Sequence, residues 1–153
     1  MTTTIILVVL AALAYAGLKI SKQPNEFRYA RSTLVNAPAS VAYELVNDFH
    51  RWDAWSPWAK MDPTAKGKFE GAQSGVGAKF HWEGPKTGAG NMAILESRPN
   101  EFIKIRLEFL KPMKALNTAE FSFQPQGNQT LVTWSMYGPN TFIGKIMSLF
   151  INC

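Results

Sequence analysis

The sequence has few of the residue types on which many catalytic and metal sites depend. Its one cysteine, Cys153, is the last of 153 residues, so neither an intrachain disulfide nor a multi-cysteine metal site can form. His50 and His81 are the only histidines, which excludes a three-histidine metal site. The G-x-S-x-G motif of serine hydrolases is also missing from the sequence. We therefore expect no metal, no cofactor and no catalytic residue that the sequence alone can assign.

Charge is sparse as well. Charged residues make up 18% of the chain, the net charge is +5, and no run of lysine or arginine occurs. This pattern predicts no nucleic-acid partner. Hydrophobic residues reach 46% and aromatic residues 12%, with five tryptophans and ten phenylalanines. Such a chain is long enough for one folded domain, and its rings imply a substantial core or an aromatic-lined cavity.

One long uncharged run stands at the N-terminus. Residues 5–18 read IILVVLAALAYAGL, and the three preceding threonines are uncharged too. Its length is near the lower limit for a membrane span and also fits the core of a signal peptide. Basic residues follow the run but none precedes it. We therefore expect an uncleaved, single-pass anchor over residues 4–18 in a bacterial-type inner membrane, with the following domain on the cytoplasmic side.

Two alternatives to an anchor stay open for this run. Ala14-Tyr15-Ala16 fits a small-residue cleavage site, so residues 1–22 can also be a signal segment whose removal leaves a periplasmic or secreted domain. The run can also be a buried core helix. In each case we expect residues 23–153 to form the domain, with a linker over residues 21–26.

The periodicity of the domain predicts a strand, a helix, a run of strands and a final helix. Residues 38–49 have helical spacing, whereas the Trp-rich segment 49–58 cannot continue that helix because Pro57 and Pro63 interrupt it. Alternation between apolar and polar residues predicts strands over residues 27–36, 78–83, 90–96, 101–110, 117–124 and 130–137. Residues 140–151 recover a helical period that is incomplete where the sequence stops. This order is typical of an α+β domain with one curved antiparallel sheet.

Several local motifs occur in an ordered set along the domain. They are Val35-Asn36-Ala37-Pro38, Asn47-Asp48-Phe49, Trp55-Ser56-Pro57-Trp58, Gly75-Val76-Gly77, Asn117 to Phe121 and Thr130 to Trp134. Together, over residues 27–153, they resemble the polyketide cyclase/dehydrase and lipid-transport superfamily, also called START-like or SRPBCC proteins. The resemblance implies a helix-grip fold, in which a curved seven-stranded antiparallel sheet wraps around a long C-terminal helix and encloses a cavity for apolar ligands. Here that helix is expected to be cut short, which would expose apolar surface and leaves a homodimer open.

The alternation of the strands predicts which side chains line the concave face of the sheet. We interpret them as the ligand-binding residues for a hydrophobic small molecule or lipid, although packing against the terminal helix is the alternative. They are Phe80, Trp82, Met92, Ile94, Ile105, Leu107, Phe109, Phe121, Trp134 and Met136. Three further rings, Trp52, Trp55 and Trp58, are interpreted as a lid or as a cap on the core.

Few groups are suited to acid–base chemistry. His50 can pair with Asp48 or Asp53, but catalysis would need a substrate within hydrogen-bond reach. Arg106 and Glu108 are expected to point away from the concave face. We therefore expect membrane-tethered binding or transport of a hydrophobic ligand. The alternatives are a polyketide cyclase-like enzyme that acts through the shape of its cavity, and a protein-interaction module.

Overall fold

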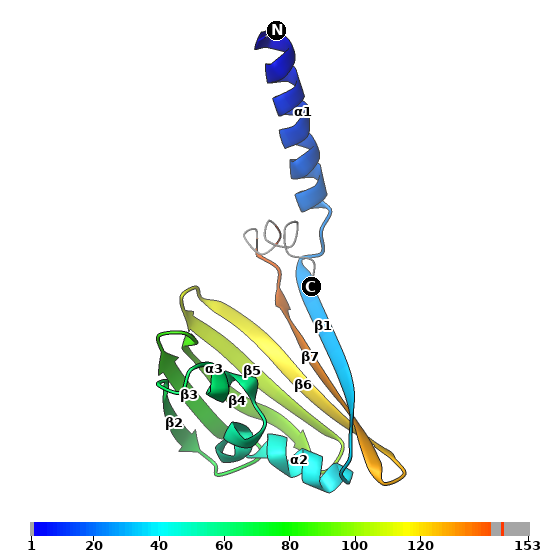
Figure 1. The fold of residues 1–153 in the computed structure, drawn as a ribbon, viewed down its shortest axis with the longest axis vertical. Helices are drawn as coiled ribbons and strands as arrows, with labels where there is room; N and C mark the ends of the chain where they lie inside the picture. Colours follow the sequence, from blue (N-terminus) through cyan, green and yellow to red (C-terminus); the bar gives the residue numbers. More distant parts are fainter. Residues whose placement is uncertain (1, 142–144, 146–153) are drawn as a thin grey trace. The chain divides into compact units, whose positions relative to one another are not determined.

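The computed structural model describes residues 2–141 and Lys145, with side chains from Ile5 onward. The chain divides into two compact units, Met1–Phe27 with Pro139–Cys153, and Arg28–Gly138. In chain order the elements are α1 (Thr2–Ser21), β1 (Glu26–Val35), α2 (Ala39–Asn47), η1 (Phe49–Ala54), α3 (Pro57–Met61), β2 (Lys66–Gly71), β3 (Ala78–Gly84), β4 (Gly88–Arg98), β5 (Phe102–Lys111), β6 (Ala115–Gln126) and β7 (Gln129–Pro139) (Figure 1).

The larger unit is built on one curved sheet of seven strands, in the order β1-β7-β6-β5-β4-β3-β2. From β2 to β7 each strand pairs in antiparallel fashion with its neighbour in sequence. Helix α2 and the short helix η1 pack their apolar residues against one face of this sheet. The expected α+β class and the seven-stranded antiparallel sheet are confirmed. The helix predicted over 140–151 lies outside the described residues, apart from residues 140, 141 and 145.

The Trp-rich segment folds as two short helices with a turn between them. Asp48 begins η1, where one of its carboxylate oxygens accepts a hydrogen bond from the backbone N–H of His50 at 2.9 Å. The indole N–H groups of Trp52 and Trp55 donate to the carbonyls of Val46 and Leu45, each at 3.0 Å. Those carbonyls belong to the last turn of α2, which lacks partners within its own helix. The tryptophans therefore terminate α2 and hold η1 against it.

Strand β2 was not expected from the sequence. Its six residues, KGKFEG, are all exposed, and it forms the outer edge of the sheet beside β3. A strand that buries no side chain has no alternation of apolar and polar residues, so its pattern resembled that of a loop.

In the smaller unit, the linker predicted over residues 21–26 is held by the segment after β7. Asn140 donates from its side-chain amide to the carbonyl of Pro24 at 3.1 Å, and from its backbone to the carbonyl of Asn25 at 2.8 Å. The ammonium group of Lys145 donates to the carbonyl of Gln23 at 3.1 Å and to Oδ1 of Asn25 at 2.8 Å. The linker is therefore fixed by two separate residues of its own unit.

The uncharged run at the N-terminus forms helix α1. Within the described residues, no helix combines the length and the apolar character that a membrane crossing requires. The spanning anchor predicted over residues 4–18 is therefore not supported.

Candidate functional site

The register of the sheet brings all ten predicted ligand-binding residues to one face. Residues that oppose each other on paired strands project their side chains to the same side. The opposed pairs are Phe80 with Met92, Trp82 with Gly90, Met92 with Leu107, Ile94 with Ile105, Gly90 with Phe109, Phe121 with Trp134, and Ala119 with Met136. Helix α2 and η1 lie on this same face, because their buried residues pack with Met92, Ile94 and Phe121. We call it the concave face.

One part of the concave face lies beneath α2 and η1 and is a packed core. We call it the covered half. Its sheet residues are Ala78, Met92, Ile94, Ile103, Ile105, Ala119, Phe121 and Phe123, none of them more than 7% exposed. Four of the ten predicted ligand-binding residues, Met92, Ile94, Ile105 and Phe121, therefore belong to the core.

Two of the three predicted lid tryptophans pack onto the covered half. The rings of Trp52 and Trp55 lie edge-on to Phe121, with centroids 6.2 and 6.0 Å away. Trp52 also lies edge-on to Phe49 at 5.3 Å. These contacts, together with the indole hydrogen bonds to α2, are those of a cap on the core. Trp58 differs, because it is 61% exposed on α3.

The rest of the concave face is less deeply buried. We call it the open half. It consists of the other six predicted residues, all half-buried: Phe80, Trp82, Leu107, Phe109, Trp134 and Met136. Trp82 and Phe109 meet edge to face with centroids 5.9 Å apart. Gly90 lies under the Trp82 ring, and a Cβ there would collide with it, so the glycine lets the indole lie close to the sheet.

A polar side chain that belongs to one of the family-like motifs, but was not predicted as a site residue, lies on this face. Asn117 opposes Leu107, two residues from the buried Ala119, and is only 8% exposed. Its amide occupies the space that a side chain at Gly138 would need. Among the described residues no side-chain hydrogen bond involves this amide. No fully buried side-chain nitrogen or oxygen there lacks a partner, so the polar atoms of Asn117 retain access to solvent and can hydrogen-bond water or a ligand.

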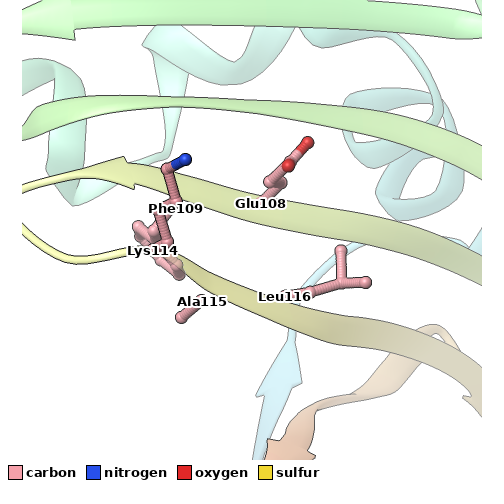
Figure 2. A pocket seen from close by; sticks show the side chains of 5 residues that line it. All are labelled: Glu108, Phe109, Lys114, Ala115 and Leu116. Carbon is pink, nitrogen blue, oxygen red and sulfur yellow. The ribbon is translucent and has the colours of Figure 1, made fainter.

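A hollow with a volume of about 180 Å³ adjoins the open half at the turn between β5 and β6. Figure 2 shows the side chains that line it, which are Glu108, Phe109, Lys114, Ala115 and Leu116. Phe109 belongs to both the hollow and the open half. The open half therefore reaches this end of the sheet.

Asp62 fixes the turn that orients Trp82. It is 3% exposed, and its Oδ2 accepts hydrogen bonds from the backbone N–H groups of Lys86 at 2.9 Å and Thr87 at 3.1 Å. The hydroxyls of Thr87 and Thr64 donate to its two oxygens at 3.2 and 2.8 Å. Burial raises the pKa of Asp62, but these four hydrogen bonds outweigh it and lower the pKa to about 2. The carbonyl of Thr87 in turn accepts the indole N–H of Trp82 at 3.3 Å.

The inward positions of β3 to β7 lack ionisable groups, whereas β1 contributes some to the concave face. The inward positions of β3 to β7 within residues 78–84, 88–94, 103–109, 115–123 and 130–138 carry no ionisable side chain. Arg28 and Ser32 of β1 meet Glu120 and Thr133 on the other face. Tyr29 and Arg31 therefore alternate to the concave side, next to β7. Arg106 and Glu108 face the other side, where both hydrogen-bond Asn91, at 3.3 and 3.0 Å. Among the described residues, no group of three or more histidine, cysteine or acidic residues could hold a metal ion.

The predicted pair of His50 and Asp48 is formed, away from these inward positions. The Nδ1 atom of His50 lies 2.7 Å from Oδ1 of Asp48, and its ring stacks on Phe69 at 3.9 Å. A second hollow of about 240 Å³ lies there, lined by His50, Phe69, Glu70, Gly71, Ala72 and Gln73. The described contacts bring no hydroxyl or thiol nucleophile to His50, so the pair has the geometry of a surface ion pair.

Comparison with solved structures shows the fold. The chain is similar to protein MLL2253 from Mesorhizobium loti, with 15% identity, a TM-score of 0.57, and coverage of 73% of this chain and 76% of that one. It is similar to protein CV1439 from Chromobacterium violaceum, at 19% identity, a TM-score of 0.55 and coverage of 84% and 94%. For CalU16 from Micromonospora echinospora the identity is 16%, the TM-score 0.53 and the coverage 80% and 71%.

Comparison of the sequence with protein families identifies the family. No curated protein matches this chain. The model of the family described as polyketide cyclase / dehydrase and lipid transport matches residues 26–151, which is most of the chain and all of the larger unit. The chain therefore belongs to the polyketide cyclase/dehydrase and lipid-transport family.

Proposed function

We propose that the open half of the concave face binds a hydrophobic small molecule or lipid that carries a hydrogen-bonding group. Membership of the family supports an apolar ligand. The observation that carries the proposal is the amide of Asn117, which belongs to a residue only 8% exposed, has no side-chain partner among the described residues and lies among half-buried apolar side chains. Ligand pockets commonly combine an apolar lining with a few polar groups that orient the ligand.

The energetics favour an occupant of this mixed kind. A hydrogen bond from the Asn117 amide to a hydroxyl, carbonyl or carboxyl group of the ligand would contribute about 0.5–1.5 kcal/mol net. Each additional Å² of apolar surface covered on Trp82, Phe109 and Met136 contributes about 25 cal/mol. A purely apolar ligand would gain only the second contribution. We therefore expect Asn117 to select ligands with a polar end.

Binding is favoured over general acid–base catalysis on this face. The described inward positions of β3 to β7 carry no ionisable side chain, and proton transfer needs such a group within hydrogen-bond reach of the substrate. Cyclisation directed by the shape of the cavity would not require one, so a cyclase-like activity is the alternative. It is distinguished by incubating a bound polyketide with the protein and separating the products by chromatography. Ring closure alone would give a new product of unchanged mass, and ring closure followed by dehydration would give one lighter by one water.

The first test is native mass spectrometry of the purified full chain, followed by extraction with organic solvent. A stoichiometric adduct with an apolar body and a polar group is the expected result. Calorimetric titration with 1-naphthol and with naphthalene then tests the amide directly. In Asn117→Leu the affinity for 1-naphthol should fall about tenfold, which corresponds to about 1.4 kcal/mol, while the affinity for naphthalene is retained.

The matched control is Thr118→Val, one residue along the same strand, which removes a polar group from the opposite face. It should change neither affinity. The proposal is wrong if both ligands fail to bind, or if Asn117→Leu and Thr118→Val weaken 1-naphthol equally.

We also propose that α1 attaches the chain to a membrane. Its described apolar side chains from Ile5 to Leu18 are 50–64% exposed wherever they are large, and a helix that is apolar on all sides is stable when that surface is covered. Flotation with vesicles of phosphatidylcholine alone should therefore be lost when Val9 and Leu10 are both changed to Glu, and retention of flotation on these neutral vesicles would contradict the proposal. On which side of a bacterial-type inner membrane the domain lies stays a prediction from the basic residues after residue 18.

A further inference from the structure

Large apolar side chains that do not pack into the core are exposed at the turn between β5 and β6 and on the strand ends beside it. Leu110 is 42% exposed, Met113 56% and Leu116 56%. Leu116 opposes Glu108, and Leu110 alternates with Phe109, so both leucines face the convex side of the sheet. Figure 2 shows Leu116 on β6 and Phe109 on β5 at this end. The hairpin therefore carries apolar groups on both of its faces and at its tip.

Elsewhere the convex side of these two strands is mostly polar. Its residues there are Lys104, Arg106, Glu108, Thr118, Glu120 and Ser122, together with Phe102, whose ring is covered by Arg98. Several of the polar side chains form hydrogen bonds and ion pairs, such as those of Glu120 with Lys104 and Tyr137 at 3.8 and 2.7 Å. On the convex side of β5 and β6, the exposed large apolar side chains therefore gather where β5 ends and β6 begins. Exposed apolar groups that lie close together indicate a contact surface.

Lysines surround this apolar tip. Lys111 ends β5, Lys114 lies in the turn that follows, and Lys86 lies in the neighbouring β3–β4 turn. The two turns are adjacent, because Ala89 opposes Lys111 and Gly88 contacts the Lys111 carbonyl so closely that a Cβ would collide with it. Lys111 pairs with Glu83 at 2.8 Å. Lys86 and Lys114 have no ion-pair partner within the described residues.

We propose that this hairpin tip, defined as residues 84–88 and 110–116, docks on the surface of a membrane that contains anionic lipids. Leu110, Met113 and Leu116 enter the interfacial layer, where apolar side chains are covered by lipid. Lys86 and Lys114 contact headgroup phosphates through their flexible stems. The combination of an apolar tip with unpaired cations distinguishes this partner from a purely apolar protein groove.

The docking surface goes beyond the proposed function and does not depend on it. It does have a consequence for it, because Phe109 connects the open half to the hollow beside Lys114. Docking at this tip would bring the end of the ligand-binding face to the bilayer, from which an apolar ligand can enter without crossing water.

The test uses the full chain with one reporter that senses the environment of the tip. With Cys153→Ser as background, Met113→Cys is labelled with an NBD fluorophore, and a matched protein carries the label at Val76→Cys. Val76 is 60% exposed and precedes β3 at the opposite end of that strand from the β3–β4 turn. Vesicles of phosphatidylcholine alone are compared with vesicles in which about one-third of the lipid is phosphatidylglycerol.

On the anionic vesicles, the label at 113 should shift to the blue and gain intensity several-fold, while the label at 76 stays unchanged. Changing Lys86 and Lys114 to Ala, or raising the salt concentration, should weaken this response about tenfold. The comparison with position 76 separates docking of the tip from attachment through α1, which would act on both proteins equally.

Three results would overturn the proposal. The first is an unchanged spectrum at 113, whether or not the protein floats with the vesicles. The second is an equal response at 76 and 113. The third is an equal response with neutral and anionic vesicles, which would remove the role of the lysines. Failure here would leave the naphthol titration unaffected, so the two proposals fail separately.

Discussion

The covered and open halves of the concave face are built from the same strands but differ in what lies on them. Ile103 and Ile105 in the covered half are 0% and 1% exposed, whereas Leu107 and Phe109, the next inward residues of the same strand, are half-buried. The difference arises because α2 and η1 pack over the first pair. Alternation along a strand therefore decides which face a residue joins, and the second layer decides whether it becomes core or surface for a ligand.

The largest effect should come from the covered half. Phe121→Ala removes a ring that touches both Trp52 and Trp55 and is 5% exposed. We expect a loss of about 3–5 kcal/mol in the free energy of unfolding, measured with urea. Affinity for 1-naphthol, measured where the variant is still folded, should change little. A loss below about 1 kcal/mol would show that this half is not a packed core.

Trp134 lies at the border of the two halves, because it is half-buried and packs against the core, as Phe80, Trp82 and Leu107 also do. Trp134→Ala should lower the free energy of unfolding by about 2–3 kcal/mol and weaken ligand binding as well. If the stability scarcely moved while affinity fell, the residue would belong wholly to the open half.

Phe109 tests the open half by itself. Its ring packs on Trp82 but is half-buried, so Phe109→Ala should cost about 1–2 kcal/mol of stability. Affinity for 1-naphthol should nevertheless fall about tenfold. Leu110→Ala is the control, since the next residue along faces the convex side and should leave the affinity unchanged. An equal effect of both substitutions on affinity would place the ligand elsewhere.

The smallest effect is expected for Asp62, because its contribution to the free energy of unfolding changes with pH only in acid. The pKa of Asp62 is lowered from 3.8 to about 2 in the folded chain, so folding favours its ionised form. Its contribution to stability is complete above about pH 5 and is lost as the pH falls through about 2. Urea midpoints of the native chain and of Asp62→Asn should therefore converge between about pH 4 and pH 2. A constant difference over that range would contradict the role of the carboxylate in holding the turn beside Trp82.

The parts of the fold that bury one face of a strand could be predicted from the sequence. Strands β3 to β7 alternate because their inward residues meet a core, and their positions were predicted to within a few residues. The edge strand β2 buries nothing and left no such signal. The apolar run of residues 5–18 predicted a helix, which α1 confirms. The apolar character of these residues does not by itself determine whether lipid or protein contacts that helix.

The sequence predicted which side chains share the concave face, but not which of them are covered by α2 and η1. Which half is covered depends on contacts such as that of Trp55 with Phe121, which join residues far apart in the chain. Asn117 was missed for a related reason. Thr130 is also polar, inward and fully buried, yet its hydroxyl donates to the carbonyl of Ala37 at 2.8 Å. A sequence shows that a polar residue faces inward, but not whether the fold provides its partner.

The absence of a side chain at Gly138 links this position to Asn117 on the neighbouring strand. Any side chain there would displace the Asn117 amide, so the two residues cannot diverge independently. Among relatives of this chain, a larger residue at position 138 should accompany a smaller or differently directed residue at 117. Where both have changed, the polar end of the ligand should have changed too. An alignment of relatives would therefore group them by the residues at positions 117 and 138. We expect each group to prefer a different ligand, which can be stated before any of these proteins is purified.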